Sequence, residues 1–409
     1  MKAKLYLPAI TFIIMAVQFG IAQTAYVPST TDSTLYVINV ATHTVTDSIH
    51  VGHDPRGVTV SSDGSRVYVA NSGSNTVSVV NTATNTVVAT VPVGNDPYGI
   101  VVTPNGSRVY VANLPDNNVY VINTAINTVI DTIAVGSVTD GAAVSPDGSM
   151  VYIANSMGNS ISVINTASNI VIHTITVGHG PRGISFTPDG SKAYVANCND
   201  SSVSVINTAA NAVTATVAVG AYPCGTVVSI DGSKAYCSNI TDNTVSIINT
   251  TTNAVTATIP IGAGPSGISI TPDGTKVYVA NSTSNSASVL NTSTNTVTNT
   301  ITVGGYPVAL GNYISPYTPT TTGIAMLSNE GKDVSIYPNP FREETTITFA
   351  EEEKDVVIHI RDVLGNIIRQ STISGKQSNI DMSGFAKGIY FVQITDEKMN
   401  VVNRKIVVE

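Results

Sequence analysis

Hydrophobic and polar residues alternate along most of this chain with a period of two. In the stretch SVSVINTAANAVTATVAVG (202–220), Val203 and Val205 alternate with serines, and Val213 and Val217 belong to a second alternating run. A period of two is typical of a β-strand with one face buried, whereas an amphipathic helix would show a period near 3.6. The pattern therefore predicts an all-β chain.

The alternating runs recur at a fixed spacing of 42 residues. Tyrosines mark the step at Tyr26, Tyr68, Tyr110, Tyr152, Tyr194, Tyr236 and Tyr278, and glycines that follow Val or Ile mark it at Gly52, Gly94, Gly136, Gly178, Gly220, Gly262 and Gly304. A constant period of this length indicates a repeat architecture. The chain contains seven copies.

One copy contains four short β-rich runs. They are GISFT (183–187), KAYVAN (192–197), SVSVIN (202–207) and VTATVAV (213–219), separated by turn-forming segments such as Pro-Asp-Gly-Ser. Asp-Gly between two such runs is a hairpin signal, because glycine accepts the positive φ of the turn. Each copy is predicted to be a four-stranded antiparallel sheet, and radial stacking into a propeller buries both faces of every sheet.

The two ends of the repeat region complement each other. The first copy begins at Tyr26 without its first strand, and GGYPVALGNYI (304–314) supplies such a strand with nothing after it. Together they complete one blade. We predict a seven-bladed β-propeller over residues 23–315, closed by its N- and C-terminal strands.

The repeat sequence resembles a known family. The segments YVAN, SVINTATNTV and VGxxPxG are similar to the YVTN-type β-propeller repeats of bacterial and archaeal surface proteins, over about residues 26–315. The resemblance implies a fold and an exposed location, and it leaves the activity open, since one fold hosts many functions.

The segments that flank the propeller differ from it in composition. Residues 1–22 contain Lys2 and Lys4, an apolar run and Gly20-Ile21-Ala22, so they read as a secretory signal peptide cleaved after Ala22. An uncleaved anchor is disfavoured by Pro8 and Gln18, and we expect no transmembrane segment in the mature chain. Residues 316–332 are a Pro/Thr-rich linker, and all eight glutamates lie from Glu330 onward.

Residues 333–409 predict a second domain of about seven short strands, a small immunoglobulin-like β-sandwich. The segments YPNPF, DVLGN, GFAKGIY and KIVVE resemble the C-terminal sorting domain of type IX secretion in the Bacteroidota. The resemblance implies that the type IX machinery is a partner and that the propeller is exported to the outer cell surface or the extracellular space. An ordinary immunoglobulin-like accessory module is the alternative.

Charge excludes some classes of partner. Charged residues make up 11% of the chain, below the ~25% of typical soluble domains, and the formal charge is −8 without basic runs. Nucleic acid is therefore not an expected partner. The VGxxPxG and ANxxxN loops should share one face of the ring, here named the top face, and they contain more Asp than Arg. The Pro-Asp-Gly-Ser turns define the opposite, bottom face.

The top-face loops differ most from copy to copy at the mouth of the central channel. A ligand-binding site is predicted there, for an anionic or sugar-like surface glycan or a protein, from His53, Asp54, Arg56, Asp96, Tyr98, Asp140, His179, Arg182, Tyr222 and Tyr306. The alternative is that loop positions are free to vary. Asp32, Asp116, Asp200 and Asp242 are Ca²⁺ candidates, but one carboxylate per blade does not make a site, so neither a metal nor a cofactor is expected.

Two further modifications are suggested by local sequence. Three cysteines in an oxidising compartment allow one disulfide, and Cys198 with Cys224 is the first choice because both follow top-face loops. The tripeptides Asp-Ser-Ile (47–49) and Asp-Thr-Ile (131–133) resemble the O-glycosylation acceptor of the Bacteroidota, which makes Ser48 and Thr132 candidate sites.

Three functions are compatible with the sequence. The favoured one is a non-catalytic binding or adhesion module that uses the top face. The second is a lactonase-like hydrolase at the channel mouth, disfavoured because the propeller has no Glu and its His residues are dispersed. The third is a purely structural surface-layer component.

Overall fold

The computed structural model describes residues 23–315, 334–337, 339, 341–361, 367–395 and 401–408. The predicted signal peptide with Ala22, and the linker at 316–332, lie outside these ranges. The chain divides into two compact units, Met1–Pro319 and Thr320–Glu409. Neither unit contains an α-helix among its described residues. Accordingly, the described residues contain no helix long and apolar enough to span a membrane.

Each blade of the first unit is a four-stranded antiparallel sheet in chain order, as predicted. In one blade β16 (Pro181–Phe186), β17 (Lys192–Asn197), β18 (Ser202–Asn207) and β19 (Ala212–Ala218) pair consecutively. The β16–β17 hairpin turns at Asp189-Gly190, where Gly190 has a φ of +70° and Asp189 Oδ1 accepts the Ser191 N–H at 3.0 Å. The recurring Asp of these turns therefore has a structural role.

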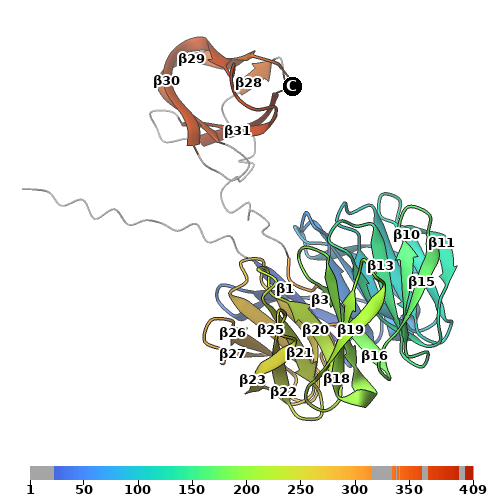
Figure 1. Cartoon of the computed structure of the whole chain (residues 1–409). Helices are drawn as coiled ribbons and strands as arrows, with labels where there is room; N and C mark the ends of the chain where they lie inside the picture. The colour runs from blue at the N-terminus through green and yellow to red at the C-terminus, as the bar shows by residue number, and fades with distance from the viewer. Residues whose placement is uncertain are drawn as a thin grey trace, which may run out of the picture. The chain divides into compact units, whose positions relative to one another are not determined.

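Five further blades have the same order, and their strands follow one another around the ring (Figure 1). The inner strands are β4 (Pro55–Val60), β8 (Pro97–Val102), β12 (Thr139–Val144), β20 (Pro223–Val228) and β24 (Pro265–Ile270). The second strands are β5 (Arg66–Asn71), β9 (Arg108–Asn113), β13 (Met150–Asn155), β21 (Lys234–Asn239) and β25 (Lys276–Asn281). The third strands are β6 (Thr76–Asn81), β10 (Asn118–Asn123), β14 (Ser160–Asn165), β22 (Thr244–Asn249) and β26 (Ser286–Asn291). The outer strands are β7 (Thr86–Pro92), β11 (Thr128–Ala134), β15 (Ile170–Thr176), β23 (Ala254–Pro260) and β27 (Thr296–Thr302). Two short 3₁₀ turns, η1 (Ser72–Ser74) and η2 (Cys198–Asp200), lie in top-face loops.

The seventh blade closes the ring from both ends of the unit, which confirms the prediction. It contains β1 (Thr24–Ser29), β2 (Thr34–Asn39) and β3 (Thr44–His50), and residues 307–314 run beside β1 as its inner strand. The Tyr26 N–H donates to the Tyr313 carbonyl at 2.8 Å, and on the other side the Val58 N–H donates to Leu310 at 2.9 Å. The closing segment thus pairs with β1 inside its own blade and contacts β4 of the next blade.

Close packing between blades explains two sequence features. The repeated tyrosines are buried, with Tyr110, Tyr194 and Tyr236 fully inaccessible. The glycine at the third position of each inner strand from β4 to β24 lets neighbouring inner strands approach: a Cβ on Gly183 would lie 2.5 Å from the Cys224 carbonyl oxygen. The channel is therefore narrow, and residues at equivalent positions of adjacent inner strands are neighbours.

The described part of the second unit is a β-domain with fewer and longer strands than predicted. It contains five strands rather than about seven, β28 (Val334–Tyr337), β29 (Glu344–Arg361), β30 (Ile367–Asp381), β31 (Gly388–Thr395) and β32 (Val401–Val408). β29 and β30 continue through register shifts near Glu353. The core contains Ile347, Ile358, Val392 and Ile406.

Candidate functional site

The second residue of each inner strand forms one layer at the top of the channel. Because the repeat is 42 residues long, the layer contains Arg56, Tyr98, Asp140, Arg182, Cys224, Ser266 and, from the closing segment, Val308. Adjacent inner strands are in contact, so each of these side chains has its neighbours 42 residues away. This layer contains four of the predicted ligand-binding residues, Arg56, Tyr98, Asp140 and Arg182.

Asp140 and Arg182 form the central ion pair of the layer. Arg182 Nε lies 2.9 Å from Asp140 Oδ2, and the side chains are 24% and 2% exposed. Burial raises the pKa of Asp140, and the Arg182 guanidinium opposes this effect. The Asp140 carboxylate in turn raises the pKa of Arg182, which keeps the guanidinium charged. Among the described residues, the buried Oδ1 of Asp140 has no hydrogen-bond partner.

Arg56 is held by a second, more exposed pair. Its Nη2 and Nε lie 2.9 Å and 3.1 Å from Asp54 Oδ2, with side-chain exposures of 30% and 35%. The guanidinium carbon lies 5.2 Å from the centre of the Tyr98 ring, within the range of a cation–π contact. Arg182 makes a similar contact with Tyr222, at 5.6 Å. Both arginines are thus neutralised within the protein.

The predicted mouth is closed where we expected an opening. Tyr98, Cys224, Val308 and Leu310 pack into one buried cluster. Their strands lie far apart around the ring, so these side chains meet across the channel axis. The structure brings Arg56, Tyr98, Asp140, Arg182, Asp54 and Tyr222 together at this buried cluster, here named the plug, and their role in ligand binding stays a prediction.

The remaining predicted residues lie in separate loops. His53 Nδ1 is 3.2 Å from Ser33 Oγ, and His179 Nδ1 is 2.7 Å from Asp200 Oδ1. The backbone N–H of Asp96 donates to Asn75 Oδ1 at 3.0 Å. Tyr306 is 49% exposed and, like the 38% exposed Tyr222, has a left-handed backbone conformation. Within the part of the chain that the structure describes, no histidine forms an ion pair or hydrogen bond with Asp140 or Arg182.

Three of the four Ca²⁺ candidates link two loops of their own blades, and the fourth, Asp32, is bonded within its own hairpin. Asp116, Asp200 and Asp242 accept the backbone N–H groups of Asn95, His179 and Ala221 at 2.6–2.8 Å. Asp32 accepts hydrogen bonds from Ser29 and Tyr36. Within the described ranges, no three His, Cys, Asp or Glu side chains are grouped to hold a metal ion. Each aspartate therefore fixes the loop at which its blade meets the top face.

The cysteine prediction is wrong in this structure. Cys198, Cys224 and Cys237 are all buried free thiols. The Cys198 thiol donates to the Pro223 carbonyl at 2.8 Å, whereas Cys224 Sγ faces Arg182 Nη1 at 3.9 Å. The two sulfurs have different partners because Cys224 belongs to the channel layer and Cys198 to the loop behind it. Burial raises the pKa of all three thiols.

The glycosylation candidates are accessible. Ser48 and Thr132 are exposed on the outer strands β3 and β11, and each backbone N–H donates to the preceding aspartate side chain at 2.8 Å. Their modification stays a prediction.

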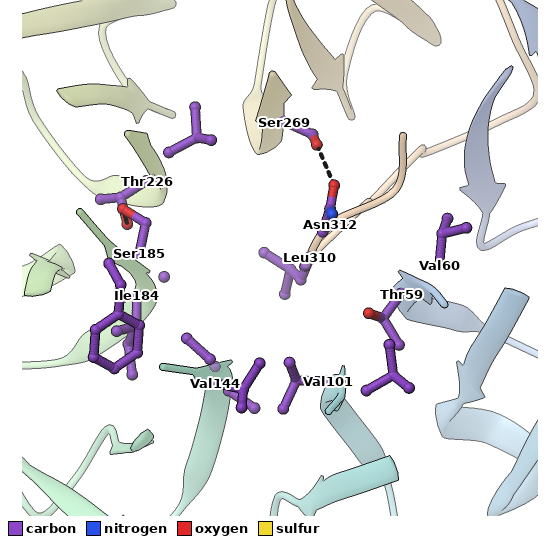
Figure 2. A pocket seen from close by; sticks show the side chains of 18 of the residues that line it. Thr59, Val60, Val101, Val144, Ile184, Ser185, Thr226, Ser269, Leu310 and Asn312 are labelled. Carbon is purple, nitrogen blue, oxygen red and sulfur yellow. Dashed lines mark hydrogen bonds between the residues drawn. The ribbon is translucent and has the colours of Figure 1, made fainter. Parts of the chain in front are cut away.

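A cavity of about 510 Å³ lies in the channel below the plug. Figure 2 shows its lining, to which each inner strand contributes, with Leu310 near the axis and Val101, Val144, Ser185 and Thr226 around it. The lining extends to Ser62, Pro104 and Ile230, which are exposed at the Pro-Asp-Gly-Ser turns, so the cavity opens at the bottom face. Sequence reasoning located the site at the top and missed this cavity.

Comparison with protein families identifies parts of both units. Residues 335–409 match the secretion system C-terminal sorting domain. Residues 128–218 and 171–309 match the seven-bladed β-propeller lactonase family, and residues 7–113 match the YNCE-like β-propeller family. The chain therefore combines a seven-bladed propeller with a type IX sorting domain, which directs it to the cell surface or the extracellular space and implies interaction with the type IX machinery.

Comparison with individual proteins supports the fold and gives little information on activity. A 78-residue segment is 36% identical to an endo-acting ulvan lyase of Formosa agariphila, covering 19% of this chain and 15% of the lyase. Among solved structures, a functionally unknown protein from Desulfotomaculum acetoxidans superimposes with a TM-score of 0.64 at 20% identity, over 73% of this chain and 100% of that one. A putative 6-phosphogluconolactonase from Bacteroides uniformis superimposes with a TM-score of 0.61 at 21% identity, over 70% of this chain and 98% of that one. Hydrazine synthase of Kuenenia stuttgartiensis superimposes with a TM-score of 0.58 at 23% identity, over 64% of this chain and 90% of that one. The three structural similarities concern the fold alone.

Proposed function

We propose that this exported propeller is a non-catalytic binding module whose contact surface is formed by the top-face loops. The carrying observation is that the charged groups at the channel mouth are paired with each other. Arg182 is bound by Asp140 and Arg56 by Asp54, and Tyr98, Cys224, Val308 and Leu310 form a buried cluster beside them. Hydrolysis needs an acid or base that can reach a substrate, and Asp140, the carboxylate of this layer, is only 2% exposed.

Exposed aromatic side chains support the top face as the contact surface. Tyr222 and Tyr306 are 38% and 49% exposed, and both have φ values near +50°, a region that bulky residues rarely occupy. Tyrosine offers a broad apolar face and a polar end at low entropic cost, which suits recognition of glycans and proteins. The exported location makes a surface glycan or a surface protein the expected ligand class.

A glycan and protein binding array with the whole chain tests this proposal. We expect a specific ligand whose binding weakens at least tenfold in a Tyr222→Ala/Tyr306→Ala variant. The matched control is Ile126→Ala, which removes an exposed apolar side chain in the turn that precedes an outer strand. Equal loss of binding in the control, or retention in the tyrosine variant, would exclude the top face. The absence of any ligand would favour the structural surface-layer role.

The second candidate function is a lactonase-like hydrolase at the same mouth. The match of residues 128–309 to the lactonase family favours it, as does the buried Asp140 Oδ1, which has no partner among the described residues. A lactone hydrolysis assay distinguishes the two functions. An enzyme should lose nearly all activity on the single change Arg56→Ala, whereas a binding surface should show no hydrolysis before or after it.

A further inference from the structure

The cavity in the lower half of the channel is chemically asymmetric, although the fold that builds it is symmetric. Four successive blades, from β16 through the closing segment, contribute the polar side chains Ser185, Thr226, Ser269 and Asn312 (Figure 2). The other three blades contribute mainly aliphatic groups, including Val101, Ala143 and Val144, together with the polar residues Thr59, Ser62 and Thr103. The arc around Val101 and Val144, here named the apolar arc, is therefore mainly aliphatic, whereas the arc from β16 to the closing segment has more polar groups along its strands.

The polar groups of this arc are partly paired with each other. Ser185 Oγ lies 3.1 Å from Thr226 Oγ1, and Ser269 Oγ donates to Asn312 Oδ1 at 3.0 Å. Within the described residues, the Nδ2 group of Asn312 has no acceptor, and the side chain is exposed at the open end. The arc is preorganised and retains hydrogen-bonding capacity toward the cavity.

Charge is missing from the lining. None of the residues that line the cavity is Asp, Glu, His, Lys, Arg, Cys or Tyr. The nearby turn aspartates are engaged locally, as Asp189 is with Thr187 and Ser191. An ionised ligand would lose hydration here without gaining a counter-charge, which disfavours its binding. A neutral ligand would displace water from the apolar arc, where water finds few partners.

We propose that this cavity binds an uncharged, mainly aliphatic molecule with hydroxyl or carbonyl groups along one side. Its volume of about 510 Å³ lies within the range of small-molecule sites, roughly 300–1,000 Å³. The plug of Tyr98, Cys224, Val308 and Leu310 separates it from the top face. The cavity is thus a second site, on the opposite side of the ring from the proposed contact surface.

Calorimetric titration of the whole chain with three eight-carbon probes tests this inference. We expect 1-octanol to bind saturably at one site, and octanoate and octylammonium to bind at least tenfold more weakly. Val144→Phe, which fills the apolar arc, should weaken octanol binding at least tenfold. Val88→Phe is the matched control, since Val88 is 50% exposed on the outer strand β7, and it should leave binding unchanged.

Asn312→Ala provides a second variant at an exposed position, which keeps the test decisive if Val144→Phe does not fold. It should weaken octanol binding severalfold. The Tyr222→Ala/Tyr306→Ala variant should leave octanol binding intact, which separates this site from the proposed top-face function. Non-saturable octanol binding, equal binding of octanoate, or full binding by both cavity variants would overturn the inference.

Discussion

The Asp140–Arg182 pair predicts a large loss of stability from an almost isosteric change. Asp140→Asn keeps the shape of the side chain but removes the charge that compensates Arg182. Removing one partner of a buried pair typically costs about 3–5 kcal/mol. Asp140 is 2% exposed, but Arg182 retains 24% exposure and can recover some hydration. We therefore expect a loss of about 3 kcal/mol in the free energy of unfolding, the lower end of that range.

Unfolding of the whole chain in guanidinium chloride, monitored by circular dichroism, measures this loss of stability. The double variant Asp140→Asn/Arg182→Met removes the unpaired guanidinium and fills its volume with an apolar group. Its free energy of unfolding should lie within about 1 kcal/mol of that of the natural chain, because neither charge has to be desolvated any longer. The control is Asp54→Asn at the more exposed Arg56 pair, which should cost only about 0–1 kcal/mol.

Two results would contradict this prediction. One is a loss of less than about 1 kcal/mol in the free energy of unfolding for Asp140→Asn, and the other is a double variant that is less stable than both Asp140→Asn and Arg182→Met alone. The first result would mean that Arg182 finds another partner or water. The second would mean that the pair stabilises the layer through its packing and not through charge compensation.

Three further predictions concern the turns, the thiols and the ring closure. The hydroxyl groups and N–H groups of their turns lower the pKa of Asp147, Asp189 and Asp231, to about 2 for the last two. The resulting stability is present above the unfolded pKa near 3.8 and is lost as pH falls toward 2, so the melting temperature should drop across this window. Changing all three to Asn, the residue that one repeat already has as Asn105, should reduce this fall in melting temperature. An equal fall in the natural chain and the triple variant would contradict the prediction. All three cysteines should react with a thiol reagent only after unfolding, since they are buried and their pKa values are raised. A mass of the native protein two daltons below that of its fully reduced form would instead demonstrate a disulfide. Tyr313→Phe removes the hydroxyl that donates to the buried Tyr278 carbonyl, so it should cost about 1 kcal/mol in denaturant unfolding, and no measurable change would argue against that bond as a contributor to closure.

The fold could be predicted from periodicity because each repeat states the same strand pattern and the same turns. The missing first strand at Tyr26 and the surplus strand at 304–314 even indicated the closing blade. The C-terminal unit was harder, since β29 is 18 residues long and continues through irregular pairing near Glu353, which a search for short strands does not predict.

The candidate site was only partly predictable. The same 42-residue step that located Arg182 also identifies Asp140 and Cys224 as its neighbours, and applying it to side-chain pairs would have found the ion pair. The plug that closes the top and the asymmetric cavity beneath it were not predicted. Both depend on side-chain packing across the channel axis, which the repeat pattern does not indicate. The cysteine pairing failed for a similar reason, because two loops can share a face while their side chains face different partners.

The most direct test of the central claim is the fate of a ligand that the top face binds. The ligand selected on the array is incubated with the whole chain and then analysed by mass spectrometry. Our account predicts that it is recovered chemically unchanged, with binding that depends on Tyr222 and Tyr306. Conversion of the ligand to a product, abolished by Arg56→Ala, would contradict the account and establish a hydrolase at the channel mouth.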